Sequence, residues 1–252
     1  MGKIIAVCLQ KGGVGKTTTA HTLANIFGKK GNRVLLVDCD DQCNSTDWTI
    51  DESSKRHTIT EVISDLCPIE EAIIKAEYID LLPADDYLAN VNRDDDPDLT
   101  IFKQYIDPIK NTYDYIILDS PPSLSNVLNN ILVCSDYVLI PTEARPDSMT
   151  GISRLMSTIE NIQHSMNPSL KILGIVLIKF HERTILNKQI KAMIQGYSMG
   201  VKTHLFNTYI REGIAVPESR MMCEPLIDYA PKSKPAIDYM KLVDEIIIQI
   251  GE

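Results

Sequence analysis

Short runs of apolar and β-branched residues recur along the chain, separated by longer stretches whose apolar residues follow helical spacing. The first run covers residues 3–9 and the second covers residues 33–39. The stretch between them predicts a helix that ends at Gly31. Further runs of the first kind cover residues 78–84, 114–120, 136–142 and 170–178. Near-continuous apolar strands that alternate with helices are typical of a parallel sheet covered on both faces.

Three later stretches, residues 147–163, 183–196 and 234–250, predict further helices, the last of them C-terminal. The acid-rich stretch 90–99 predicts an exposed loop, and the chain shows no internal repeat or low-complexity tract. We therefore expect an α/β fold with a mostly parallel twisted sheet and helices on both faces. We also expect a single domain over residues 1–252.

Composition narrows the class of protein. A chain of 252 residues with 44% hydrophobic content can bury one sizeable core. It contains no apolar run near the roughly 18 residues that a membrane span needs, and its start does not resemble a secretion signal. The six cysteines form no CxxC pair, so reduced structural thiols are expected. These features predict a soluble, cytoplasmic protein.

The net charge of −9 argues against a protein that binds nucleic acid through its overall charge. The charge is unevenly distributed, however, because residues 164–211 contain seven lysines or arginines and a single acid, Glu182. A local basic face on an acidic protein is therefore possible.

The sequence after the first apolar run has the composition of a phosphate-binding loop. Gly12, Gly13 and Gly15 allow backbone N–H groups to turn inward around phosphate oxygens at the start of a helix. Lys16 then suits the β- and γ-phosphates, and the Thr17 hydroxyl suits Mg²⁺. The usual motif GxxxxGK[ST] would place its first glycine at position 10, where this chain has glutamine, and an additional lysine, Lys11, follows.

Acidic residues lie at the ends of two further apolar runs, 33–39 and 114–120. Asp119 lies at the carboxyl end of the run 114–120, where open α/β sheets place ligands, and it could hold a metal or cap the next helix. The stretch "VDCDDQCN" offers Asp38, Asp40 and Asp41 to orient an attacking water, although these acids could instead form a turn.

The motifs "KGGVGKTTT", "VDCDDQCNST" and "YDYIILDSPPSLS" together resemble the deviant Walker A ATPases, and most closely the ParA/Soj partition ATPases. The likeness extends to "VLIPTEARPDSMTGISRL" and "EPLIDYAPKSKPAIDYMKLVDEI", so it spans nearly the whole chain. It implies a P-loop NTPase fold, ATP and Mg²⁺ as cofactors, and ATP hydrolysis to ADP and phosphate.

The resemblance also assigns roles to residues. It implies that Lys11 crosses a dimer interface to the partner's nucleotide, and it favours Asp40 among the acids of the second motif. The implied catalytic residues are Lys11, Lys16 and Asp40. The implied metal site consists of Thr17, Asp40 and Asp119. The implied nucleotide ligands are Lys11, Gly12, Gly13, Val14, Gly15, Lys16, Thr17, Thr18 and Glu218.

Members of the resembled family bind double-stranded DNA without sequence preference as ATP-bound homodimers, and a centromere-binding ParB-like partner stimulates hydrolysis and release. The resemblance thus implies plasmid or chromosome partition at the nucleoid. Candidate DNA contacts are Arg183, Lys188, Lys202, Arg211 and Arg220, with Lys232 and Lys234 behind them. Each of them could also be an ordinary solvated charge.

The chain departs from the family at two places. Asp41 and Cys43 replace a usual proline and glycine, and "YIREGIAVPES" differs around the family's arginine, which leaves the DNA contacts open. Trp48, the only tryptophan, lies just beyond Asp40, so we expect nucleotide-dependent fluorescence, with ordinary packing as the alternative.

Three other functions share this chemistry. A MinD-like membrane ATPase needs a basic amphipathic tail, whereas "KLVDEIIIQIGE" is acidic. An ATPase resembling the nitrogenase iron protein needs cluster cysteines in glycine-rich contexts, which are absent from this sequence. An ATPase that positions some other cargo stays open, because motifs do not identify cargo.

Overall fold

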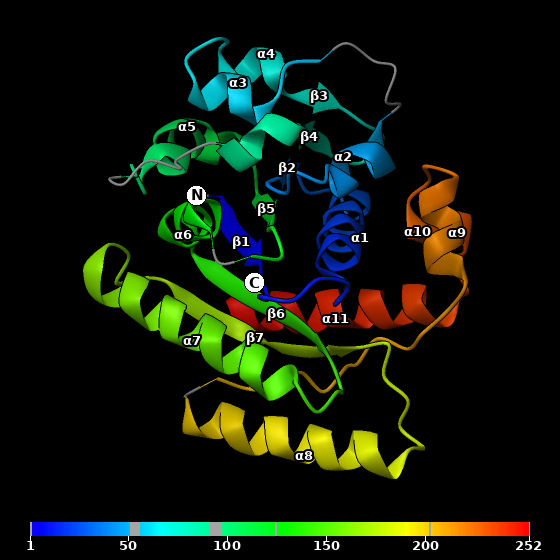
Figure 1. Ribbon diagram of the computed structural model, residues 1–252. Coiled ribbons are helices and arrows are strands. Elements are labelled where there is room, and N and C mark those ends of the chain that lie inside the picture. The colour runs from blue at the N-terminus through cyan, green and yellow to red at the C-terminus, as the bar shows by residue number, and fades with distance from the viewer. Residues whose placement is uncertain (1, 51–55, 91–96, 124, 202, 252) are drawn as a thin grey trace.

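The protein forms one seven-stranded sheet covered by helices on both faces (Figure 1). This computed structural model describes residues 2–50, 56–90, 97–123, 125–201 and 203–251. Residues 91–96 of the expected acidic loop, and Lys202 among the candidate DNA contacts, lie outside these ranges.

The strand order is β3-β4-β2-β5-β1-β6-β7. The strands are β1 (Lys3–Val7), β2 (Val34–Asp38), β3 (Ile74–Lys75), β4 (Asp80–Leu82), β5 (Tyr115–Asp119), β6 (Tyr137–Glu143) and β7 (Lys171–Ile178). Every pairing is parallel except that of β3 with β4 at the edge. The prediction of a mostly parallel sheet is confirmed, and all six expected strands are present. The two residues of β3 are too few to give a periodic pattern.

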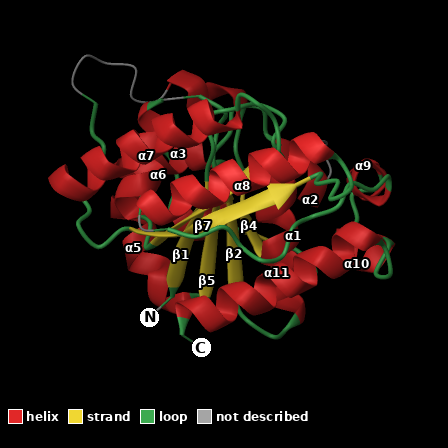
Figure 2. Ribbon diagram, turned by 90° about the horizontal axis from the view of Figure 1, so that it is seen from below, coloured by secondary structure: helices red, strands yellow, loops and turns green. Residues whose placement is uncertain are grey.

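Alternate side chains of the strands enter two separate apolar layers. In β1, Ile4 and Ala6 face one layer, whereas Ile5 and Val7 face the other. The layer with Ile5 is covered by α1 (Lys16–Lys29), α9 (Ala215–Met221), α10 (Leu226–Tyr229) and α11 (Lys234–Ile250). The layer with Ile4 is covered by α3 (Ile59–Ile63), α4 (Ile69–Ala72), η1 (Asp86–Asn90), α5 (Ile101–Ile109), α6 (Asn126–Cys134), α7 (Ser148–Ser165) and α8 (Ile185–Gly200). Figure 2 shows the strands between these two sets.

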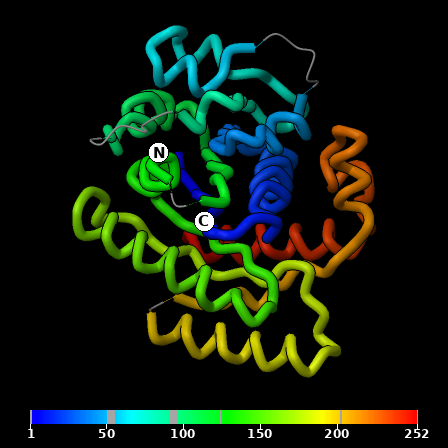
Figure 3. Tube along the Cα trace, in the orientation of Figure 1, coloured from blue at the N-terminus to red at the C-terminus, as the bar shows by residue number. Residues whose placement is uncertain are grey.

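The expected helices are present with small changes in their ends. The predicted helix 183–196 begins and ends later, as α8, and Figure 3 shows it in yellow at the outer edge of the molecule. Two short elements, α2 (Asn44–Thr49) and η2 (Lys110–Thr112), complete the set. None of the helices among the described residues is long and apolar enough to cross a bilayer. All six cysteines are free, as expected.

Parallel pairing decides where the candidate site lies. The carboxyl ends of β1, β2 and β5 meet at one edge of the sheet, since Val7, Asp38 and Asp119 occupy equivalent positions in register. The loop that leaves β1 at this edge enters α1 at Lys16. Loops at the carboxyl ends of parallel strands are where α/β proteins bind ligands.

Candidate functional site

The loop between β1 and α1 has the backbone shape of an anion-binding nest. Gly13 and Gly15 adopt left-handed conformations, with φ of 73° and 70°, which only glycine adopts without strain. Gly15 is the N-cap of α1, and a Cβ atom at Gly15 would lie 2.6 Å from Cδ1 of Ile178. The two glycines are therefore required by backbone conformation, and Gly15 also by its close contact with the end of β7.

Lys16 occupies the first turn of α1 with its side chain buried, and its Nζ donates to the Lys11 carbonyl oxygen at 3.0 Å. Burial lowers the pKa of Lys16, and the carboxylates of Asp119 and Asp40 oppose that shift. The structure thus places the predicted phosphate lysine beside both predicted acids. A buried ammonium group directed at the loop is suited to a polyphosphate.

Asp119 at the end of β5 has the properties expected of a metal ligand. It is fully buried, and Ser45 donates to its Oδ2 at 2.8 Å, while its Oδ1 has no hydrogen-bond partner among the described residues. Burial, followed by repulsion from Asp38, raises the pKa of Asp119 to about 7, and the Thr17 hydroxyl opposes the shift. An unsatisfied buried carboxylate oxygen beside a threonine hydroxyl fits a hard cation such as Mg²⁺.

The three acids of the second motif have different environments. Asp38 is fully buried, and its two oxygens accept hydrogen bonds from Thr46 and from the Asp40 amide. Burial raises the pKa of Asp38 to about 6. Asp41 is partly exposed and contacts the side chain of Gln42. Asp38 therefore holds the loop to α2, which agrees with the turn-forming alternative for this one acid.

Asp40 is slightly more exposed than Asp38 and less exposed than Asp41. It is buried and accepts a backbone hydrogen bond from Gln42 at 3.2 Å, and burial raises its pKa while Lys16 opposes the shift. Its charge therefore acts on the same ammonium group as that of Asp119. Of the three acids of this motif, Asp40 is therefore the one whose charge acts on Lys16 in the loop.

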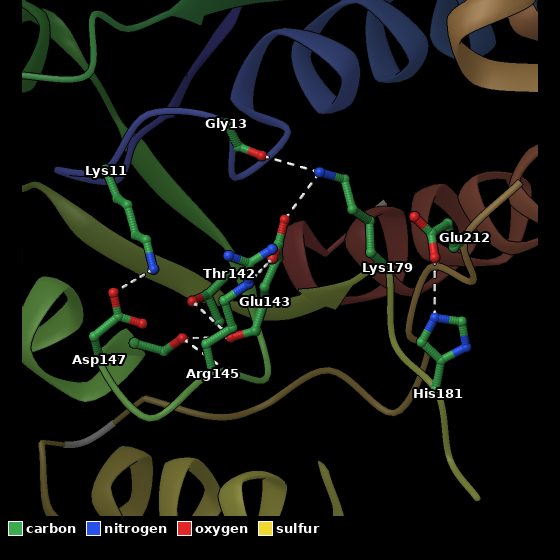
Figure 4. A network of polar contacts seen from close by, with 10 residues as sticks. Lys11, Gly13, Thr142, Glu143, Arg145, Asp147, Lys179, His181 and Glu212 are labelled. Carbon is green, nitrogen blue, oxygen red and sulfur yellow. Dashed lines mark hydrogen bonds and ion pairs between the residues drawn. The ribbon is translucent and has the colours of Figure 1, made fainter. Parts of the chain in front are cut away.

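Lys11 points away from its own loop. Its Nζ lies 2.6 Å from Oδ2 of Asp147, the N-cap residue of α7, and both side chains contact solvent (Figure 4). Only the backbone of Lys11 contacts Lys16 in this arrangement. The two lysines of the motif therefore have different surroundings, since one is buried in the loop and the other lies at its rim.

A second ion pair at the rim is one that the sequence analysis missed. Nζ of Lys179, directly after β7, donates to the Gly13 carbonyl at 3.1 Å and to Oε1 of Glu143 at 2.9 Å (Figure 4). Glu143 ends β6 and also pairs with Arg145. No spacing rule connects Lys179 to a glycine 166 residues away in sequence, so only the fold reveals this contact.

A cavity of about 520 Å³ opens beside the loop, next to Gly15 and Thr18. Its other walls come from Ile178 and Lys179 at the end of β7, from residues 210–214, and from Trp48, Val216, Pro217, Arg220 and Tyr239. Its volume lies in the range of small-ligand pockets. Arg211 was expected to contact DNA and Trp48 to report nucleotide or to pack, so neither was predicted to line a cavity.

Trp48 on α2 is buried and stacks on His21 of α1, with ring centroids 4.2 Å apart. Its Nε1 donates to the Glu224 carbonyl at 3.1 Å. Burial lowers the pKa of His21 to about 3, so this ring is neutral at neutral pH. Trp48 thus connects the motif that contains Asp40 to α1 and to the segment after α9.

The residues expected to contact DNA differ in what they contact. Arg183 and Lys188 are exposed at the beginning of α8, and Lys232 and Lys234 are exposed before and at the start of α11. Arg211 instead forms a bidentate ion pair with the buried Asp238, through hydrogen bonds of 2.7 Å from Nε and Nη2. Nη2 of Arg220 donates to Oδ1 of Asn44.

Glu218, expected among the nucleotide ligands, does not line the cavity. Its Oε2 accepts a hydrogen bond of 3.3 Å from the Tyr229 hydroxyl, which joins α9 to α10. Its neighbours Val216 and Pro217 are the residues of α9 that line the cavity together with Arg220.

Comparisons with known proteins show the family and the fold. Residues 2–172 match the model of a family described as "AAA domain". The sporulation initiation inhibitor protein Soj of Bacillus subtilis is 34% identical over 98% of both chains. The chromosome partitioning protein ParA of Caulobacter vibrioides is 32% identical over 97% of this chain and 94% of its own. Cobyrinic acid a,c-diamide synthase of Mycobacterium smegmatis, solved with ADP and magnesium, superposes with a TM-score of 0.83 at 26% identity, over 97% of this chain and 93% of its own.

Proposed function

We propose that this chain, which belongs to the ParA/Soj family of P-loop ATPases, uses cycles of ATP binding and hydrolysis to partition DNA. The observation that carries the proposal is the pair of lysines on one loop. Lys16 is buried toward the acids, whereas Lys11 is directed outward at the rim. A lysine that does not serve its own loop is available to a second subunit.

Different parts of the site bind the phosphates, the nucleoside and the metal ion of the nucleotide. The nest of Gly13 and Gly15 and the ammonium group of Lys16 bind the phosphates. The cavity beside Thr18 receives the nucleoside. Thr17, Asp40 and Asp119 hold Mg²⁺, which neutralises the charge of the transferred phosphoryl group when it is bound. The Mycobacterium smegmatis structure with ADP and magnesium supports both ligands, although that enzyme's name denotes another reaction.

The protein residues then divide the chemistry of hydrolysis. Asp40 accepts a hydrogen bond from the attacking water and so orients it. The raised pKa of Asp40 also favours transfer of that water's proton to its carboxylate. Lys16 stabilises the negative charge that spreads over the phosphoryl oxygens. Lys11 of a second subunit adds a cation at the same position, much as an arginine finger does. ATP binding and dimerisation thereby become a single event, and hydrolysis weakens the dimer.

DNA binding without sequence preference follows from basic side chains directed at phosphates. Arg183, just before α8, and Lys188, near its beginning, are both exposed. A homodimer doubles this basic surface on a chain whose net charge is −9. A ParB-like centromere-binding partner that stimulates hydrolysis would release the protein from the nucleoid.

The test is binding to a random-sequence DNA duplex with ATP, ADP or no nucleotide, over a series of salt concentrations. We expect binding with ATP only, a steep loss of affinity with salt, and no binding by Lys11→Ala. Lys30→Ala is the matched control, because Lys30 is also an exposed lysine paired with an exposed acid, Asp244. An ATP-dependent dimer that ignores DNA would refute partition and favour a MinD-like ATPase or another positioning ATPase that acts on a membrane or a protein surface.

A further inference from the structure

The backbone of Lys179 has a conformation that is unfavourable for a residue with a side chain. β7 ends at Ile178, and Lys179 then adopts φ of 47°, in the left-handed region that favours glycine. Such conformations persist where surrounding contacts hold them, and they occur often at functional sites. Here the contacts are those of the Lys179 ammonium group with Gly13 and Glu143 (Figure 4).

The contact with Gly13 determines the orientation of one peptide group in the phosphate loop. A trans peptide is planar, so its C=O and the following N–H point in opposite directions. Because Lys179 holds the Gly13 carbonyl outward at 3.1 Å, the Val14 N–H is turned to the inner side of the loop. That inner side is where a nest of backbone N–H groups binds an anion.

Glu143 holds the lysine in place. Its side chain is 9% exposed, and Oε1 accepts from Lys179 at 2.9 Å, while Arg145 pairs with the same carboxylate. A charge-assisted hydrogen bond in a partly dry position is stronger than one between neutral groups. The ends of β6 and β7 thus hold the loop at the Gly13 carbonyl, beside the cavity that Lys179 also lines.

We propose that Lys179 is a positioning residue for nucleotide binding, which fixes the Gly13–Val14 peptide with its N–H facing the phosphates. The inference rests on the proposed function, since it assumes that this loop binds a nucleotide. It adds a third lysine to the site. Lys16 contacts phosphate in its own subunit and Lys11 contacts the nucleotide of a second subunit, whereas Lys179 acts on the loop backbone. An ordered loop needs no rearrangement on binding, so its affinity for both ATP and ADP rises.

The test is the affinity of Lys179→Met for fluorescent ADP and ATP analogues. We expect about a tenfold weaker affinity for both nucleotides, as for the loss of one hydrogen bond to a charged group. The same variant should lose hydrogen-exchange protection in the peptide that contains Val14, without nucleotide present. Lys171→Met is the control, because Lys171 is an exposed lysine at the opposite end of the same strand, and it should change neither quantity.

Two further variants make the result decisive. Lys179→Arg keeps the cation and should recover part of the affinity, and Glu143→Gln should act in the same direction as Lys179→Met without adding to it. A Lys179→Met protein that melts at a lower temperature but binds both nucleotides as tightly as the wild type would overturn the positioning role alone. A wild-type protein that binds nucleotide no better than Lys16→Ala would overturn the proposed function and this inference together.

Discussion

Lys11 and Asp147 form an ion pair of 2.6 Å between the phosphate loop and the N-cap of α7. The pair lies within one chain, yet the proposed target of Lys11 is the nucleotide of a second chain. Lys11 must therefore leave Asp147 when the dimer forms. The ion pair acts against dimerisation by the amount that it stabilises the monomer.

Replacement of Asp147 by asparagine should favour the ATP-dependent dimer. Each dimer breaks two such ion pairs, one in each subunit, and exposed pairs contribute little, so we expect dimerisation to become a few times tighter. Analytical ultracentrifugation with ATP measures the change. Asp244→Asn removes a comparable exposed acid from Lys30 and should leave the dimer unchanged. Weaker dimerisation of Asp147→Asn would show that Asp147 supports the dimer instead.

Substitutions of Lys16 and of Asp40 should affect different steps, nucleotide binding and ATP hydrolysis. Lys16→Ala should abolish nucleotide binding, because it removes the buried cation of the loop. Asp40→Ala should keep ATP bound, slow hydrolysis by about a hundredfold or more and trap the dimer. Asp41→Ala is the control, as a neighbouring acid with greater exposure. A monomeric Asp40→Ala protein in saturating ATP would contradict the assignment of Asp40.

Trp48 should report the nucleotide state by its fluorescence. It is the only tryptophan of the chain, so the signal has a single source. Its ring stacks on His21 and lines the cavity beside the loop, and its helix follows the motif of Asp40. We expect the emission with ATP and Mg²⁺ to differ from that with ADP, and no response in Lys16→Ala. Identical spectra with the two nucleotides would mean that Trp48 only packs.

The fold and the phosphate loop could be predicted from the sequence because their signals are local. Apolar runs define β1, β2 and β5, and the glycines that shape the loop lie next to Lys16 and Thr17 in the chain. Asp119 was found because parallel strands end at a common edge, which the strand pattern already implies.

Contacts between distant segments could not be predicted in the same way. Asp147 lies 136 residues after Lys11, and Lys179 lies 166 residues after Gly13. No pattern of spacing links these pairs, because the path of the chain through β6 and β7 brings them together. Charge counting likewise finds Arg211 in a basic segment but gives no sign of the buried Asp238 that it pairs with.

His21 should make stability depend on pH in mildly acidic solution. Its pKa is lowered from 6.5 to about 3 by burial, and secondarily by Arg220, so the folded state favours the neutral ring. The unfolded state takes up the proton first as the pH falls, so this stability is complete above pH 6.5 and is lost toward pH 3. At pH 5 the loss is about 2 kcal/mol. Raised pKa values of Asp38 and Asp119 act in the opposite direction over the same pH range, so the measurement is a comparison. From pH 7 to pH 5, urea unfolding should show a less favourable change in stability for the wild type than for His21→Phe, which keeps an aromatic ring beside Trp48. An equal loss in both proteins would assign the effect to other groups.

Arg211→Ala should reduce stability as well as any binding of DNA. Asp238 is buried and accepts two hydrogen bonds from the Arg211 guanidinium and one from its backbone N–H. Removal of the guanidinium leaves a buried carboxylate with only the backbone donor, at a cost of about 1–3 kcal/mol. Lys188→Ala is the control, because Lys188 is exposed, and it should weaken DNA binding with little change in unfolding.

The double variant Arg211→Ala, Asp238→Ala should regain part of the stability, since no buried charge is then left unpaired. An Arg211→Ala protein that unfolds like the wild type but fails to bind DNA would show that the guanidinium leaves Asp238 for phosphate.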